Sequence, residues 1–215
     1  MIEHTRDGDV HVLRMTNGEN RMGPEFVRRF GAVLDDVEAK SEGACALVVT
    51  GEGKFFSNGI DLAAAATLDA DGLRAFTHDF EALGVRLALL PVPTIAALNG
   101  HAFAGGAVFA LACDERVMRT DRGWLCLNEV DVQVPLPRRL MNVVRAKLTP
   151  AVARDALLAA RRFTGPEALA NAVVDACVPE LDVLPRALER ARALATKPRA
   201  TFAAIKREWL RGVGD

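Results

Sequence analysis

Short apolar stretches and longer amphipathic stretches alternate along the first two thirds of the chain. Polar and apolar residues alternate over residues 11–15, as in a half-buried strand, and continuous apolar stretches at 44–50 and 94–98 are typical of buried strands. Apolar residues at helical spacing predict one helix beginning at Pro24 and another over residues 73–90. Further expected elements are strands at 115–118 and 124–127 and a buried helix after Gly105. This order predicts an α/β fold.

Helical patterns dominate the last third of the chain. The exception is an apolar stretch at residues 173–178. We therefore expect a core over residues 1–145 and a helical C-terminal region over residues 146–215. The apolar residues that share one face of the last helix, and that predict a helix core or a contact between subunits, are Phe202, Ile205 and Trp209.

Composition narrows the class of protein. The 215 residues are 50% hydrophobic and carry 27 basic against 28 acidic side chains, which gives no general attraction for nucleic acid or anionic membranes. The four cysteines form no CxxC pair and the four histidines show no ligand spacing, so we expect no disulfide framework and no metal site. The start of the chain lacks the apolar core of a signal peptide, and no apolar run reaches the length of a membrane span. We expect a soluble, cytoplasmic protein.

Two segments share a layout in which an apolar strand leads into a glycine-bearing loop and then a helix. The first loop contains Gly59 and Ile60, and the second contains Gly105 and Gly106. Glycine lets the backbone approach a ligand with an outward-pointing N–H, and a helix beginning at Gly105 adds unpaired amides. Two such amides converging on one oxygen would form an oxyanion hole. The alternative is that these glycines only turn the chain.

The same loops resemble a known family. FFSNGIDL is similar to the FxxGxDL segment of the crotonase, or enoyl-CoA hydratase/isomerase, family, and PVPTIAALNGHAFAGGA is similar to its PxIAxxNGxAxGG segment. The resemblance continues through CDERV, LNEVDV and RRFTGPEALANAVVDACVP. It implies a β-β-α spiral with a helical region for oligomerisation, a homotrimer or dimer of trimers, and an acyl-CoA thioester substrate. Coenzyme A would enter as part of that substrate, with no separate cofactor.

The resemblance also assigns roles to single positions. The backbone amides of Ile60 and Gly105 match the two oxyanion donors of the family. Members of the family extend some tens of residues further at the C-terminus, so we expect this chain to differ in its assembly and in the lid over the acyl site. The residues expected to contact the coenzyme A part of the substrate are Arg21, Lys54, Phe56, Asn58, Gly59 and Gly106.

The choice of reaction depends on the carboxylates near the hole. Hydratases of this family use two glutamates, and the position of one of them, three residues after Gly105, holds Val108 in this chain. The other matches Glu129, in a string similar to that of Δ3,Δ2-enoyl-CoA isomerases. One carboxylate that reaches both C2 and C4 can remove a proton from the first carbon and return one to the second. The resemblance therefore implies an isomerase of fatty-acid β-oxidation with Glu129 as its acid/base, whose pKa the apolar neighbours Leu127 and Val130 would raise.

Several alternatives stay open. In the first, Glu129 is only a solvated residue at the end of a strand. In the second, Asp131, two residues on, assists Glu129 in hydration or another crotonase-type reaction. In the third, the protein binds acyl-CoA without catalysing a reaction. A serine triad is not expected, because Ser57 lies outside any GxSxG motif. For His101, beside the second glycine loop, we expect a structural role.

Overall fold

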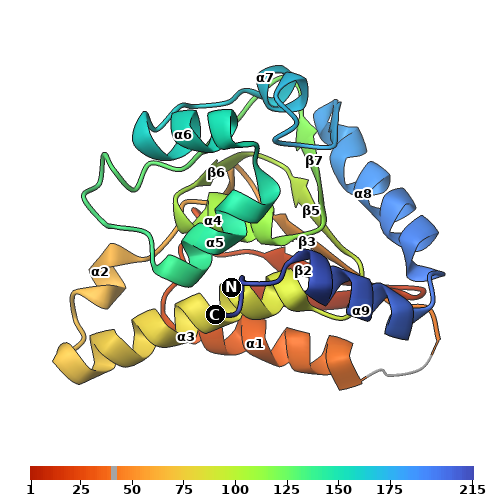
Figure 1. Ribbon diagram of the computed structural model, residues 1–215, viewed down its shortest axis with the longest axis horizontal. Coiled ribbons are helices and arrows are strands. Elements are labelled where there is room, and N and C mark those ends of the chain that lie inside the picture. The colour runs from red at the N-terminus through yellow and green to blue at the C-terminus, as the bar shows by residue number, and fades with distance from the viewer. Residues whose placement is uncertain (40–42) are drawn as a thin grey trace.

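Strands of a large, mostly parallel sheet form the centre of the fold. The computed structural model describes residues 1–39 and 43–215 (Figure 1). The strand order is β1-β2-β3-β5-β7-β9, in which β1 runs antiparallel to β2 and the other neighbours are parallel. The strands are β1 (Ile2–Asp7), β2 (Val10–Met15), β3 (Ala46–Gly51), β5 (Thr94–Leu98), β7 (Glu115–Arg119) and β9 (Ala176–Val178).

A second, smaller sheet grows out of the first. Its parallel strands are β4 (Phe55–Ser57), β6 (His101–Phe103) and β8 (Leu125–Cys126), in that spatial order. Each follows a strand of the large sheet, and a helix comes next, so the chain repeats a strand-strand-helix unit. This is the β-β-α spiral that the resemblance implies. Because β4, β6 and β8 are parallel, the loops that leave them lie at one edge.

The helices cover both faces of the large sheet. In Figure 1, α8 lies to the right of the strands, while α1 and α3 lie below them. The helices are α1 (Pro24–Ala39), α2 (Leu62–Ala65), α3 (Ala70–Leu89), α4 (Gly105–Ala112), α5 (Arg138–Lys147), α6 (Pro150–Leu158), α7 (Gly165–Ala170), α8 (Glu180–Ala195) and α9 (Arg199–Trp209).

Helix α4 lies at the centre of the larger apolar core. All of its residues are buried, which explains why its sequence is apolar on every side. Phe109 of α4 packs edge-on against Phe30 of α1, with ring centroids 5.6 Å apart, and its ring is tilted against that of Phe80 of α3, with centroids 5.2 Å apart. Burying each such ring stabilises the fold by about 1.5–3 kcal/mol. This packing fixes Gly105, the first residue of α4, at the edge where the small-sheet loops emerge.

The C-terminal region shares the sheet of the core. Strand β9 pairs with β7, and α8 packs its buried side chains, Val183 among them, against Val48 and Ile95 on the opposite sheet face. In α9 the buried side chain is Lys206, whose Nζ lies 2.8 Å from Asp114 Oδ2. The expected apolar face of α9 is instead exposed within one chain, with Ile205 and Trp209 each 64% exposed.

The expected long elements are all present, while three short or exposed strands escape the sequence pattern. Strand β1 is largely exposed and polar, and β4 and β6 are three residues long, which is too short for an alternating pattern to register. Among the described residues, no helix combines the length and the apolar character that crossing a membrane would require.

Candidate active site

A cavity of about 340 Å³ lies where the loops of the small sheet face α3. Its walls are mostly apolar and include Phe76, Phe80 and Leu136. A few polar groups also reach it, which is the composition typical of a small-molecule site. Those polar residues are Arg21, Asn58, Thr77, Asn128 and Glu129, together with the backbone at Ile60 and Gly105.

A larger groove of about 760 Å³ lies between α1 and α3. Among the described residues, neither glycine loop lines this groove, and none of its carboxylates is buried without a hydrogen-bond partner. Size alone would favour this groove, but the smaller cavity holds the groups that could do chemistry. The smaller cavity is therefore the candidate active site.

The two glycine loops touch each other at the cavity. Gly59 has a φ of +76°, and a Cβ placed on it would lie 3.1 Å from the Phe103 carbonyl oxygen and 3.2 Å from Gly105 N. A side chain at Gly59 would therefore meet the backbone of the second loop. This close approach brings Ile60 and Gly105 to the same wall of the cavity.

Backbone hydrogen bonds hold the first glycine loop in place but leave one of its amides without an acceptor. Asn58 N donates to Glu19 O at 2.9 Å, and Asp61 N donates to Met22 O at 3.1 Å. Within the described residues, the Ile60 amide between them donates to no carbonyl or side chain. Gly105 begins α4, so its N–H has no acceptor inside the helix. Two free amides therefore lie in the cavity wall, as an oxyanion hole requires.

Ala104 holds a strained conformation directly before α4. Its φ of +46° is one that a residue with a side chain rarely adopts. Hydrogen bonds fix it on both sides, from Ala104 N to Cys126 O at 2.9 Å and from Val108 N to Ala104 O at 3.0 Å. The turn at Ala104 lets the chain leave β6 and enter α4 within one residue, which sets the direction of the Gly105 amide.

Glu129 follows β8 and lines the cavity. Its Oε2 is buried and has no hydrogen-bond partner among the described residues. Burial raises the pKa of Glu129 from 4.5 to about 7. A structural carboxylate of this kind would normally be paired. A buried carboxyl whose Oε2 faces a cavity without a partner, and whose pKa is raised to about 7, is instead suited to proton transfer.

Arg21 and Asn58 stand at the polar side of the cavity and share one partner. Arg21 Nη2 lies 2.7 Å from Glu19 Oε2, and Asn58 Nδ2 donates to the same oxygen at 2.9 Å. The hydrogen bonds from Asn58 and Arg21 lower the pKa of Glu19 below its usual value. This network holds both side chains in place beside the first glycine loop.

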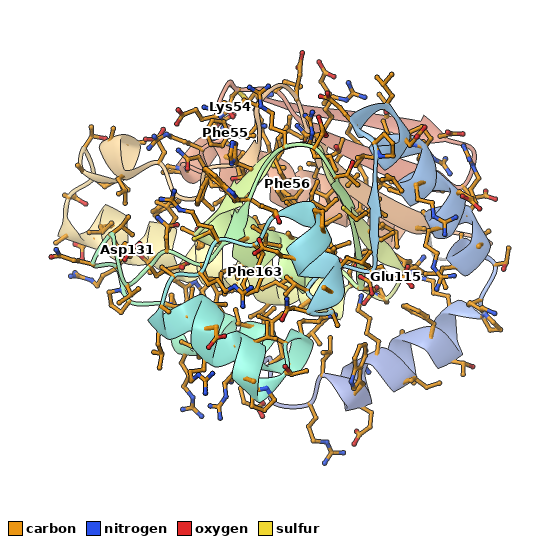
Figure 2. The ribbon with its side chains drawn as sticks, turned by 90° about the horizontal axis from the view of Figure 1, so that it is seen from above. Lys54, Phe55, Phe56, Glu115, Asp131 and Phe163 are labelled. Carbon is orange, nitrogen blue, oxygen red and sulfur yellow. The ribbon has the colours of Figure 1, made fainter. Side chains whose placement is uncertain are left out.

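Other expected contact residues lie off the cavity wall. Lys54 is exposed over the ring of Phe55, 5.5 Å from its centroid, and Figure 2 shows both at one edge of the molecule. Phe56 is fully buried in the core. Gly106 is also buried, and a Cβ on it would lie 2.4 Å from Ser57 O, so this glycine lets α4 approach β4. Their roles toward coenzyme A stay predictions.

The alternative catalytic residues also lie outside the cavity. Asp131 is exposed on an outlying loop (Figure 2). Val108 is fully buried in the apolar core and does not line the cavity. His101 accepts a hydrogen bond from Trp124 N at 3.2 Å and packs between aromatic rings, which is a structural role. Ser57 Oγ donates to Asn20 O at 2.8 Å, so it holds the loop.

Sequence reasoning missed parts of the cavity. Asn128 has a buried Oδ1 without a hydrogen-bond partner, next to Glu129. In the sequence, Phe76 and Phe80 indicate only the apolar face of a helix. Their position in the cavity wall depends on how α3 packs, which the sequence pattern does not predict. The described residues contain no group of three or more histidine, cysteine or acidic side chains arranged to hold a metal ion.

Known proteins resemble the chain over most of its length. The family model for enoyl-CoA hydratase/isomerase matches residues 5–214. A peroxisomal enoyl-CoA delta isomerase 2 of Arabidopsis thaliana is 39% identical over 175 residues, which cover 78% of this chain and 73% of that protein. A putative enoyl-CoA hydratase of Thermus thermophilus is 35% identical over 194 residues, covering 87% and 74%.

Solved structures agree with this comparison. The crystal structure of a probable enoyl-CoA hydratase from Mycobacterium tuberculosis has a TM-score of 0.91 at 29% identity, and covers 99% of this chain and 89% of that one. The spiral fold, the paired glycine loops and the family match agree with one another. The chain belongs to the enoyl-CoA hydratase/isomerase, or crotonase, family.

Proposed function

We propose that the protein is a Δ3,Δ2-enoyl-CoA isomerase in which Glu129 is the single acid/base. One observation carries the proposal. Among the described residues that line the cavity, Glu129 is the only carboxylate, and its Oε2 has no hydrogen-bond partner in the same cavity as the free amides of Ile60 and Gly105. The curated isomerases among the relatives support the same reaction.

The reaction needs one base and one oxyanion site. Glu129 removes a proton from C2 of a 3-enoyl thioester, and the electron pair moves through C1 onto the thioester oxygen. The Ile60 and Gly105 amides donate to that oxygen and stabilise the dienolate; each such donor contributes about 10²–10³ in rate. The electrons then return, the double bond settles between C2 and C3, and protonated Glu129 gives its proton to C4. Base and acid are the same carboxyl, so no second titratable group is required.

Hydration would need more than the cavity offers. A hydratase must hold and split a water molecule, and in this family two glutamates do so. Here the second position is Val108, whose side chain lies in the core. Hydration is the competing proposal, because a relative of the chain is named a putative enoyl-CoA hydratase.

Binding of the thioester involves the polar side of the cavity. In this proposal Arg21 and Asn58 contact the coenzyme A part, and Phe76, Phe80 and Leu136 contact the acyl chain; their position in the lining of one cavity supports it. Coenzyme A then leaves with the product as part of the thioester. The exposed apolar face at Ile205 and Trp209 of α9 supports a homotrimer or a dimer of trimers. We place the reaction in cytoplasmic fatty-acid β-oxidation.

One comparison of rates tests the proposal. The purified protein is given a 3-enoyl-CoA and, separately, a 2-enoyl-CoA, and acyl-CoA binding is measured by titration. Isomerisation should be far faster than hydration. Efficient hydration would overturn the argument from Val108, and acyl-CoA binding with neither reaction would identify a non-catalytic member.

A further inference from the structure

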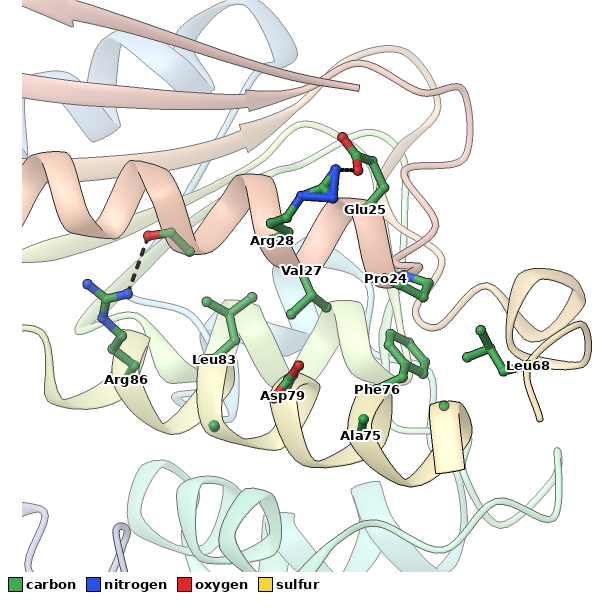
Figure 3. A pocket seen from close by; sticks show the side chains of 13 residues that line it. Pro24, Glu25, Val27, Arg28, Leu68, Ala75, Phe76, Asp79, Leu83 and Arg86 are labelled. Carbon is green, nitrogen blue, oxygen red and sulfur yellow. Dashed lines mark hydrogen bonds and ion pairs between the residues drawn. The ribbon is translucent and has the colours of Figure 1, made fainter. Parts of the chain in front are cut away.

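Phe76 separates the active-site cavity from the groove between α1 and α3. It lines both hollows, and no other described residue does. Figure 3 shows its ring at the end of the groove next to Leu68, with Ala75 of α3 nearby. The side chain is only 5% exposed. One aromatic ring therefore borders both a cavity of about 340 Å³ and a groove of about 760 Å³.

The partition lies in line with the reaction centre. A Cβ on Gly105 would lie 2.7 Å from Phe80 Cζ, so Phe80 stands directly beside the second amide. Phe76 precedes Phe80 by one turn of α3, and their ring centroids are 6.2 Å apart. Moving along α3 away from Gly105, a chain held at the amides meets first Phe80 and then Phe76.

The groove beyond Phe76 suits an uncharged, flexible hydrocarbon. Val27 and Leu83 face it, and Gly31, Gly72 and Ala75 leave its floor without bulky side chains. The charged residues at its edge are Glu25, Arg28, Asp79 and Arg86. Ion pairs engage three of them, Glu25 with Arg28 and Arg29, and Arg86 with Asp35 and Glu38. The fourth, Asp79, has its Oδ1 3.3 Å from His78 Nδ1. No unpaired cation is left at the described edge to attract an anionic ligand.

We propose that Phe76 determines the length of the acyl chain, because its ring closes the cavity and the groove behind it receives a longer chain once that ring is removed. The proposal rests on the proposed function, since it names the part of the acyl-CoA that the groove would hold. A competing route leaves the cavity at its mouth, where Leu62, Leu73 and Val132 line the cavity and are 43–49% exposed. The two routes predict different effects of mutation.

The test compares Phe76→Ala with Leu73→Ala. Isomerase kcat/KM is measured for 3-enoyl-CoA substrates from short to long chains. Each methylene that gains a buried position should raise kcat/KM about fourfold. Phe76→Ala should therefore raise the ratio of long-chain to short-chain kcat/KM by at least about tenfold over wild type, whereas Leu73→Ala should leave it within about twofold.

A shifted ratio in Leu73→Ala with no shift in Phe76→Ala would overturn the proposal and assign the chain to the mouth. Circular dichroism checks folding, and Phe76→Leu, which keeps more of the buried volume, replaces Phe76→Ala if the latter does not fold. Phe76→Leu should shift the ratio in the same direction by a smaller factor, and an unchanged ratio would again refute the role of Phe76.

Binding of saturated acyl-CoA thioesters separates this proposal from the proposed function. If the wild type fails to isomerise, the reaction assignment fails. The affinity of each variant for saturated thioesters of increasing length still measures chain selection. A preference for longer thioesters in Phe76→Ala relative to wild type would support the partition, and an identical length profile would refute it.

Discussion

Glu129 should make isomerase activity depend on pH with a midpoint near neutrality. Burial raises the pKa of its carboxyl from 4.5 to about 7, which disfavours the charged form by about 3 kcal/mol at 1.36 kcal/mol per pH unit. The base must be ionised to remove the C2 proton. For the free enzyme, kcat/KM should therefore be constant above about pH 7 and fall about tenfold for each unit below it.

The assay is kcat/KM for a 3-enoyl-CoA from pH 5 to pH 9, with circular dichroism at each pH to exclude unfolding. At pH 5 the value should be about a hundredth of the plateau. A profile that stays flat down to pH 5 would refute the reasoning, because it would mean that the base ionises near the ordinary pKa of a glutamate.

The same pKa shift makes the stability of the fold depend on pH, in the opposite direction to activity: activity rises with pH, whereas stability falls. The native state holds the Glu129 proton up to about pH 7, while the unfolded chain releases it near 4.5. The native state therefore binds more protons between these values, and stability falls as pH rises through this window, by up to about 3 kcal/mol. In Glu129→Gln this loss should be absent, so urea unfolding at pH 5 and pH 8 should differ less than for the wild type.

Three further substitutions test the surroundings of the site. Gly106→Ala should unfold or strongly destabilise the protein in thermal melts, because its Cβ would lie 2.4 Å from the Ser57 carbonyl oxygen; wild-type stability would contradict that packing. Ala104→Gly should stabilise the fold by about 1 kcal/mol in urea unfolding, because glycine accepts a φ of +46° without strain; a clear loss of stability would contradict it. Lys206→Met should cost about 1.5–3 kcal/mol, because it removes the charged hydrogen bond from Lys206 Nζ to the partly buried Asp114 at 2.8 Å, while Thr94 and Lys147 still contact that carboxylate; a neutral effect would show that α9 is held by other contacts.

The sequence predicted those features that depend on local pattern. The long strands, the helices beginning at Pro24 and Gly105, and the two glycine loops follow from apolar spacing and glycine positions. It also placed Glu129 beside the loops, because the family motif preserves that order. Side-chain direction was harder to predict. Val108 lies in the core and Phe76 in a partition between two hollows, and both placements depend on how α3 and α4 pack.

Two of the short strands were beyond prediction for a different reason. Strands β4 and β6 are three residues long, so their pairing is decided by the neighbouring strands and not by their own sequence. The unpaired Oδ1 of Asn128 could not be anticipated either, because hydrogen-bond partners are set by tertiary contacts.

The central claim, that one carboxylate carries both proton transfers, is tested by the turnover of Glu129→Gln beside a matched control. Glutamine keeps the size of the side chain but cannot accept the proton, so isomerase kcat should fall by about 10²–10⁴ while acyl-CoA affinity changes little. The control is Asp131→Asn, which removes an exposed carboxylate outside the cavity and should keep kcat within about twofold of wild type. If Glu129→Gln retains more than about a tenth of the wild-type kcat, or if Asp131→Asn loses as much as Glu129→Gln, Glu129 is not the single acid/base.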